Sequence, residues 1–285
     1  MIYPEKQIQI KGIYGIIDAK KKPDFIFEGE SHPFWEMVYV KEGSVGVAAD
    51  ERIYSLSAGD VIFHKPMEFH RIWSTENSSP NLNIITFEAD GKKIKELENM
   101  TLKLDEVSII LLERCVEIGK KAFAFNRGSV AMSIEDERLC QEYCNYLEIF
   151  LLLLVSRGSA EKLPIESSYE SKLFSDIVLF LRDSIEEKLT VDEIADRFFV
   201  SPSRVKRLFS KYAGIGIINY FNNMKILEAQ KLLREGLTVA ETAKKLGFSN
   251  QFYFCTVFKK LCALTPSEFR RREMAEIAKK LLTNK

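Results

Sequence analysis

Histidine and carboxylate side chains that could do metal or acid–base chemistry are concentrated near the start of this 285-residue chain. All three histidines, His32, His64 and His70, lie in one stretch, and Glu36 follows closely after the first. Imidazole and carboxylate groups are ligands for divalent metals, and they also orient small molecules in otherwise apolar pockets. Which role applies depends on the fold that surrounds them.

A second group of polar residues lies in two segments that repeat one design, Thr190 to Gly214 and Thr238 to Ala263. Each begins T-V-x-E-x-A, in which the Thr and Glu predict a capping box at the start of a short helix. A turn follows, and then a second helix that is apolar on one side and polar on the other. This pattern is typical of a helix-turn-helix, which presents its second helix to the major groove of DNA.

The outward face of each second helix supplies the residues that we expect to contact DNA. Phosphate contacts supply affinity, and base contacts supply specificity. We expect base contacts from Ser203, Arg204, Lys206, Arg207, Asn250, Gln251, Phe252 and Thr256, and phosphate contacts from Lys211, Lys259 and Lys260. Arg207 suits bidentate readout of guanine, and Asn or Gln suits adenine. Because Thr256 stands where the first unit has Arg207, the first unit is expected to carry more base specificity.

One helix is predicted between the two units, from about Gly216 to Glu235. At about 1.5 Å per residue it is roughly 30 Å long, close to the spacing of about 34 Å between successive major grooves. One chain is therefore expected to place two second helices in neighbouring grooves on one face of the DNA, with bending of the duplex.

The later segment resembles the DNA-binding domain of the AraC-type bacterial transcription regulators. The shared residues are Ala229, Leu232, Leu233, Val239, Ala243, Gly247, Phe248, Tyr253, Phe254, Phe258, Lys259, Lys260, Thr265, Pro266, Phe269 and Arg270. Two positions depart from the pattern, since Lys225 replaces the usual Arg and Ala263 replaces the usual Gly before Thr-Pro. The resemblance implies a transcription regulator, more often an activator, that binds double-stranded DNA, with RNA polymerase as a further partner.

Residues 1 to about 95 contain many short apolar runs separated by turn residues, which favours a barrel or sandwich of strands. The runs from His32 to Gly43 and from Tyr54 to His70 resemble the cupin-like sensory domain of the same family. That resemblance implies a β-barrel that binds a small-molecule effector. The side chains expected to line its pocket are Phe34, Trp35, Glu36, Tyr39, Phe63, His70 and Trp73.

We expect this pocket to hold no metal and no cofactor. Metal-binding cupins, which the runs resemble, use two His and a Glu from the first motif and one His from the second. Here the position two after His32 is Phe34, and Glu36 follows too soon to match the usual ligand. Strand alternation also argues against His64 as a ligand if Phe63 points into the pocket. His32, Glu36 and His70 are then polar groups at the mouth of the barrel or hydrogen-bonding residues that stabilise the fold.

From residue 96 to 158 the apolar spacing becomes helical. A helix from about Ile134 to Arg157 is apolar nearly all round at Leu151 to Leu154, so it must be covered on more than one side. We expect the barrel on one side and a second copy of the chain on the other, with coverage inside one chain as the alternative. Residues 159–171 predict a linker to a DNA-binding domain at 172–285.

Charge and cysteine content narrow the class of protein. The net charge is zero, but basic residues predominate after Glu166 and acidic residues before it, as suits a DNA-binding part attached to a different one. Five cysteines without a disulfide-like framework indicate a reducing cytoplasm. We expect no signal peptide and no membrane contact, because the apolar run from Ile149 to Val155 is too short to cross a bilayer.

Three classes of function are considered. A ligand-responsive, DNA-binding transcription regulator is favoured. A metal-dependent cupin enzyme attached to a regulator is the second class, and a redox or metal sensor that uses Cys140 and Cys144 is the third. The sequence contains no catalytic triad, phosphate-binding loop or zinc-ligand spacing, so we expect no enzyme.

Overall fold

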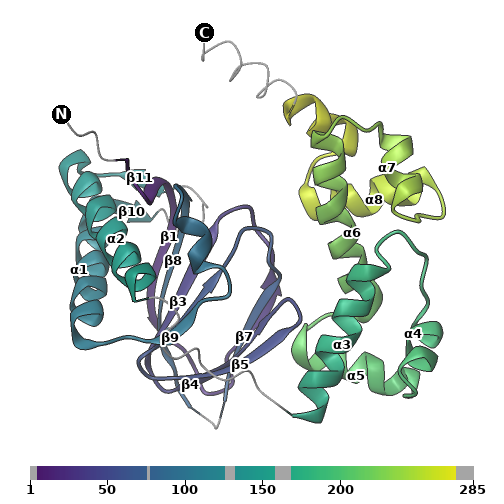
Figure 1. The fold of residues 1–285 in the computed structure, drawn as a ribbon, viewed down its shortest axis with the longest axis horizontal. Helices are drawn as coiled ribbons and strands as arrows, with labels where there is room; N and C mark the ends of the chain where they lie inside the picture. Colours follow the sequence, from purple (N-terminus) through teal and green to yellow (C-terminus); the bar gives the residue numbers. More distant parts are fainter. Residues whose placement is uncertain (1–4, 76–77, 126–131, 158–167, 274–285) are drawn as a thin grey trace. The chain divides into compact units, whose positions relative to one another are not determined.

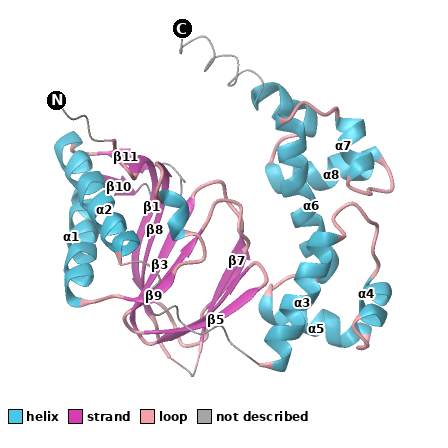
Figure 2. Ribbon diagram, viewed as in Figure 1, coloured by secondary structure: helices cyan, strands magenta, loops and turns pink. Residues whose placement is uncertain are grey.

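The computed structural model describes residues 5–75, 78–125, 132–157 and 168–273. The chain forms two compact units, residues 1–167 and 168–285. Strands dominate the first unit, and the regular elements of the second are helices (Figure 2). Most of the predicted linker, residues 159–171, lies outside the described residues, and its last residues already belong to a helix.

Two antiparallel sheets make up the β part of the first unit (Figure 1). One sheet has the strand order β1-β8-β3-β6-β9, and the other has the order β2-β7-β4-β5. The strands are β1 (Gln9–Lys20), β2 (Ile26–Glu30), β3 (Trp35–Glu42), β4 (Ser44–Ala49), β5 (Arg52–Ser57), β6 (Asp60–His64), β7 (His70–Ser74), β8 (Asn81–Asp90) and β9 (Thr101–Lys103).

The predicted barrel is instead an open sandwich. In the described part of the chain, no strand pairing joins one sheet to the other. Buried branched side chains fill the space between them, among them Val38 and Val40 of β3, Val45 of β4 and Ile72 of β7. A series of short strands has the same sequence pattern in a barrel and in a sandwich, since only the pairing of the edge strands distinguishes the two.

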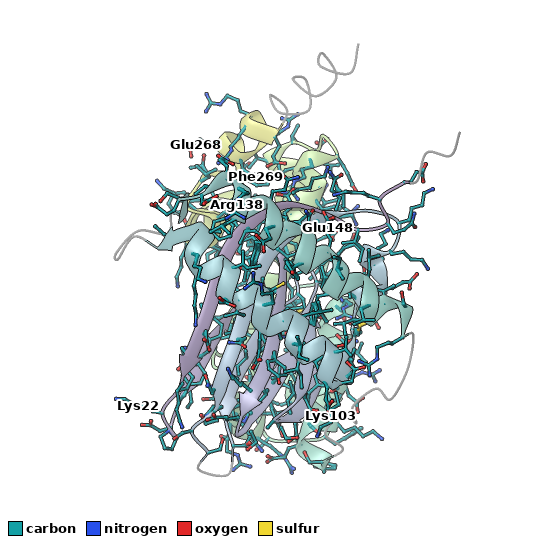
Figure 3. All side chains as sticks on the ribbon, turned by 90° about the vertical axis from the view of Figure 1, so that its left-hand side faces the viewer. Lys22, Lys103, Arg138, Glu148, Glu268 and Phe269 are labelled. Carbon is teal, nitrogen blue, oxygen red and sulfur yellow. The ribbon has the colours of Figure 1, made fainter. Side chains whose placement is uncertain are left out.

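Helices α1 (Glu106–Ala122) and α2 (Glu137–Ser156) cover the outer face of the first sheet. Figure 3 looks onto them, with Arg138 and Glu148 labelled on α2 and the strands behind. The segment predicted as helical also contains strand β9 and the short hairpin of β10 (Phe123–Phe125) and β11 (Met132–Ile134). A turn of 3₁₀ helix, η1 (Ile94–Leu97), precedes β9.

Helix α2 is long and apolar enough to cross a membrane by length and composition, which the shorter run considered in the sequence did not reveal. One face of it packs into the core of the first unit. Glu148, in its second half, accepts hydrogen bonds from Lys6 Nζ at 2.9 Å and from the Ile10 amide at 3.0 Å. The α2 side chains buried against the first sheet and α1 are Tyr143, Leu147, Phe150, Leu151, Leu154 and Val155.

The second unit contains two helix-turn-helix units joined by one long helix. Its helices are α3 (Tyr169–Asp183), α4 (Val191–Arg197), α5 (Pro202–Tyr212), α6 (Ile217–Arg234), α7 (Val239–Lys245) and α8 (Gln251–Cys262), and residues 266–273 are also helical. Figure 1 shows α4 and α5 at one end of α6, and α7 and α8 at the other. The bounds of α6 agree with the helix predicted between the two repeats.

Each helix-turn-helix has its own core, and α6 contributes to both. At the first, Phe209 of α5 packs 5.1 Å from Phe174 of α3 and 5.3 Å from Tyr220 of α6. At the second, the buried side chains are Ile226, Ala229, Leu232, Leu233, Ala243, Leu246, Phe254, Phe258 and Phe269. One end of α6 is therefore fixed to α5 and the other to α8, the second helix of each helix-turn-helix, which we call the reading helices.

Candidate functional site

The first helix-turn-helix begins with the predicted capping box. The Thr190 side chain accepts a hydrogen bond from the Glu193 amide at 3.3 Å, and the Glu193 carboxylate accepts one from the Thr190 amide at 2.7 Å. Ser201 caps α5 in the same way, accepting from the Arg204 amide at 3.2 Å. Pro202 occupies the first turn, where a missing N–H costs little. The box at Thr238, which caps α7, is also formed.

All but one of the residues predicted to contact DNA from α5 are exposed, namely Ser203, Lys206, Arg207 and Lys211. Arg204 is the exception. It is half-buried, and its guanidinium lies 5.0 Å from the ring of Tyr169 on α3. This cation–π contact holds Arg204 against α3 and away from the open face of the helix.

Glu170 belongs to the same surface and was missed by the sequence reasoning. Its carboxylate lies 2.8 Å from Lys211 Nζ and 3.9 Å from Arg207 Nη2. The hydrogen bond from Lys211 lowers the pKa of Glu170 below its usual value. The residue was assigned to the linker, and the early start of α3 is what places it beside α5. Two predicted DNA-contacting cations therefore already have an anionic neighbour.

The residues predicted to contact DNA from the second helix-turn-helix are all exposed, namely Asn250, Gln251, Phe252, Thr256, Lys259 and Lys260. Asn250 also has a structural role, because its Oδ1 caps α8 by accepting from the Tyr253 amide at 2.7 Å. Its Nδ2 donors remain for a base. Phe252 is 83% exposed, which is unusual for a large apolar side chain and suits contact with a thymine methyl.

Lys225 lies in the middle of α6 and is only 4% exposed. Its Nζ donates hydrogen bonds to the carbonyl oxygens of Glu187 and Leu246, both at 2.5 Å. The ammonium also lies over the rings of Phe221 and Phe248. Burial lowers the pKa of Lys225 to about 8. Since Glu187 precedes α4 and Leu246 ends α7, Lys225 connects both helix-turn-helix units to α6.

Four polar side chains meet at one end of the space between the sheets, and we call them the His–Glu cluster: Glu30, His32, Glu36 and His70. Glu30 ends β2 and pairs with His70, which begins β7. His32 Nε2 lies 3.5 Å from Glu36 Oε2, and His70 Nε2 lies 3.3 Å from Glu36 Oε1. The four potential ligand atoms all lie within 4.8 Å of one another.

Burial and neighbouring charges shift the pKa values of the residues in and beside the His–Glu cluster. Burial alone would raise the pKa of Glu36, but His32 and His70 outweigh burial and hold that pKa far below its usual range. Burial would lower the pKa of His70, yet the Glu36 carboxylate raises it. His64 stacks on His70 at 4.4 Å, and its Nδ1 lies 2.9 Å from Glu68 Oε2. For His64 burial dominates, and the pKa is lowered.

The residues predicted to line the pocket do not share one face. Glu36 and His70 belong to the cluster, and the ring of Phe34 stacks on that of His32 at 3.9 Å. Trp73 points to the opposite face of β7 from His70, because the strand alternates, and it lies 5.7 Å from the Arg71 guanidinium.

The other three predicted pocket residues, Trp35, Tyr39 and Phe63, pack in the core between the first sheet and helices α1 and α2. His64 occupies the inner face that the sequence reasoning gave to Phe63. The reason is that β3 and β6 are buried on both faces, so alternation of burial could not show which side faces the second sheet.

The cysteines of α1 and α2 are poorly suited to redox sensing. Burial raises the pKa of Cys115 and of Cys144 to about 12, and it also raises the pKa of Cys140. A thiol with a raised pKa holds little of the reactive thiolate near neutral pH. These observations argue against the sensor based on Cys140 and Cys144.

Each of the two units matches a known protein family. Residues 13–96 match the family described as AraC-like ligand binding domain, and residues 194–272 match the family described as Helix-turn-helix domain. The uncharacterized HTH-type transcriptional regulator YdiP of Escherichia coli K12 is 24% identical over 243 residues, 83% of this chain and 78% of its own. The uncharacterized HTH-type transcriptional regulator YfiF of Bacillus subtilis 168 is 26% identical over 257 residues, 84% of this chain and 77% of its own.

A solved structure, that of ToxT from Vibrio cholerae O395, is 16% identical, with a TM-score of 0.37, over 93% of this chain and 98% of that one. The two matching families occur in the order of the two units described above, the sandwich first and the paired helix-turn-helix second. The chain therefore belongs to the AraC family of helix-turn-helix transcription regulators and carries an N-terminal AraC-like ligand-binding domain.

Proposed function

We propose that this regulator is a ligand-responsive transcription activator in which each chain reads two successive major grooves. The observation that carries the proposal is the length of α6, which has 18 residues and a reading helix packed at each end. At the helical rise per residue it is about 27 Å long, against about 34 Å for one turn of DNA. Bending the DNA toward the protein shortens the remaining gap.

Two matched substitutions on α5 test the reading mode. Arg207→Ala is expected to relax specificity at one base pair by about 1–3 kcal/mol, because a bidentate contact to guanine is lost. Lys211→Ala, on the same helix and with the same loss of charge, is expected to weaken binding to all sequences evenly. The slope of log affinity against log salt concentration is expected to become less steep by about one. Selection of sites from random DNA measures both, and an unchanged base preference in Arg207→Ala would contradict the assignment.

The two-groove mode is tested by footprinting on a selected site. Protection is expected over two successive major grooves on one face of the duplex. Gln251→Ala on α8 is expected to weaken protection in one of them and leave the other intact. Protection of a single groove by the parent protein would overturn this part of the proposal.

For the effector we propose the end of the sandwich where the His–Glu cluster lies, with Phe34 as an apolar neighbour. Buried polar groups beside an aromatic ring are the composition of a small-ligand site. A thermal-shift screen of sugars and other small metabolites identifies candidates, and transcription in vitro with RNA polymerase tests their effect. Repression instead of stimulation by the liganded protein would refute the activator role.

We also propose a cytoplasmic homodimer formed through α1 and α2. These helices expose Val107, Ile110 and Ile149, whose exposed fractions are 59%, 65% and 53%. Exposed apolar side chains on one pair of helices favour a protein partner. Ile110→Glu is expected to produce monomers in analytical ultracentrifugation, whereas Ile17→Glu on β1, also at an exposed isoleucine, is expected to leave the dimer intact. A parent protein that is monomeric at micromolar concentration would exclude this interface.

A further inference from the structure

The His–Glu cluster and its neighbour His64 contain more unsatisfied polar atoms than a folded protein usually retains. Among the residues that the structure describes, the buried Nε2 atoms of His32, His64 and His70 have no hydrogen-bond partner. The ring of His70 lies 4.9 Å from that of His32 and 4.4 Å from that of His64. A buried polar atom left without a partner loses its hydration and gains nothing in return. Two of them, those of His32 and His70, belong to the His–Glu cluster, which indicates that another species completes the site.

Backbone hydrogen bonds determine which ring nitrogen carries the proton in two of these histidines. His32 Nδ1 lies 3.0 Å from the carbonyl oxygen of Phe34, and His70 Nδ1 lies 3.2 Å from the carbonyl oxygen of Glu68. A carbonyl oxygen can only accept, so each Nδ1 must be the donor. Each neutral ring then directs the Nε2 lone pair at the cluster. Metal-binding histidines have this arrangement, in which the second nitrogen donates to a carbonyl.

Both lone pairs face the oxygens of one carboxylate, that of Glu36. The two N···O separations are 3.5 Å from His32 and 3.3 Å from His70. Two acceptors cannot hydrogen-bond to each other, so either an extra proton on a buried ring or a metal cation must lie between them. Ligands bound at about 2.1 Å to one tetrahedral ion are about 3.4 Å apart, which matches both separations. Glu30 provides a second carboxylate, more than a shared proton requires.

We propose that Glu30, His32, Glu36 and His70 bind one divalent first-row transition metal ion, such as Zn²⁺ or Fe²⁺, inside the ligand-binding domain. Two imidazoles and two carboxylates suit these ions, and the absence of a thiolate from the cluster disfavours Cu⁺. Glu30 is exposed, whereas Glu36 and His70 are buried, so Glu30 marks the side from which an ion enters.

The metal-free expectation from the sequence considered only residues from His32 onward. A histidine was sought two residues after His32, and the structure instead places a carboxylate, Glu30, two residues before it. His32 and Glu36 are four residues apart, so strand alternation would place both on the same face. Pairing of β2 with β7 then brings Glu30 beside His70.

Metal binding is measured on the full-length protein, prepared without a histidine tag and treated with a chelator. Calorimetric titration with Zn²⁺ alone is expected to show one ion per chain. Titration with Co²⁺ is expected to give the visible absorption bands of a site with nitrogen and oxygen ligands. A parent protein that takes up neither ion would overturn the proposal.

Substitutions locate the site. Glu36→Gln and His70→Gln are expected to lower the metal affinity more than about 100-fold, since each removes a direct ligand. Glu30→Gln, at the exposed rim, is expected to fold like the parent and still bind Zn²⁺ more weakly. Glu28→Gln makes the same change two residues away on β2, outside the cluster, and is expected to bind like the parent. Unchanged affinity in both Glu30→Gln and Glu36→Gln, or an equal loss in Glu28→Gln, would refute this ligand set.

Discussion

Lys225→Met removes a buried charge that is bonded to both helix-turn-helix units. Methionine keeps the length and the apolar stem of the side chain, but it cannot donate to the carbonyl oxygens of Glu187 and Leu246. The two carbonyl oxygens lose their donor, at a cost of about 1–3 kcal/mol each, and removal of the buried charge offsets part of this. We expect the free energy of unfolding of the second unit to fall by about 2 kcal/mol near neutral pH.

The difference between parent and variant is expected to grow as the pH rises. The pKa of Lys225 is 10.5 in the unfolded chain and about 8 in the folded one. Between these values the unfolded chain binds more protons than the folded chain, so the stability of the parent increases with pH. From about pH 7.5 to about pH 9.5 the gain amounts to about 2 kcal/mol. Methionine carries no such proton, so the variant lacks this gain.

Urea unfolding followed by two signals separates the effect from changes elsewhere. Both tryptophans, Trp35 and Trp73, lie in the first unit, so their fluorescence follows that unit. Far-UV circular dichroism is dominated by helices, most of which lie in the second unit. Lys225→Met is expected to lower the midpoint of the circular dichroism transition and to leave the fluorescence midpoint unchanged. Lys225→Arg keeps a charge that does not titrate in this range, and it serves as the control for pH.

A pH-independent difference between the parent and Lys225→Met, from about pH 7.5 to about pH 9.5, would refute the reasoning. It would mean that the amine keeps its ordinary pKa and that its two hydrogen bonds are made without desolvation of the charge. A fall in the fluorescence midpoint alone would place the damage in the first unit and contradict the role assigned to Lys225.

Glu170→Gln removes the carboxylate that competes with phosphate for Lys211, so DNA affinity is expected to rise several-fold. Anisotropy titrations measure the affinity, and an unchanged affinity would contradict the competition. Phe199, in the turn of the first helix-turn-helix, is 95% exposed and has a φ of 54°. The equivalent residue of the second helix-turn-helix is Gly247, with a φ of 64°. Phe199→Gly is therefore expected to raise stability in urea by about 1 kcal/mol, and a loss would show that the ring has a contact worth more than the strain. Gly247→Ala is expected to cost at least about 1–2 kcal/mol, because its Cβ would lie 2.3 Å from the Glu186 carbonyl oxygen; parental stability in the same assay would exclude that clash.

The paired helix-turn-helix could be predicted from the sequence because its signals are local. The capping boxes at Thr190 and Thr238 each need only two residues three positions apart, and both are formed. The end of the first helix and the start of the second are set by neighbouring residues such as Ser201 and Gly247. The length of α6 follows from the same local periodicity, and this is why its bounds agree with the prediction.

The sensory domain depended on contacts between segments far apart in the chain. In β3 every residue from Trp35 to Val40 is buried, so the pattern of burial carries no mark of which face meets the second sheet. Packing of α1 and α2 on one side assigns Trp35 to the helices, and it thereby turns Glu36 toward His70. Pairing between β2 and β7 adds Glu30 to that group. Caps and helix lengths depend on near neighbours in the chain, whereas this cluster depends on strand pairing and on which face of a doubly buried sheet the helices cover.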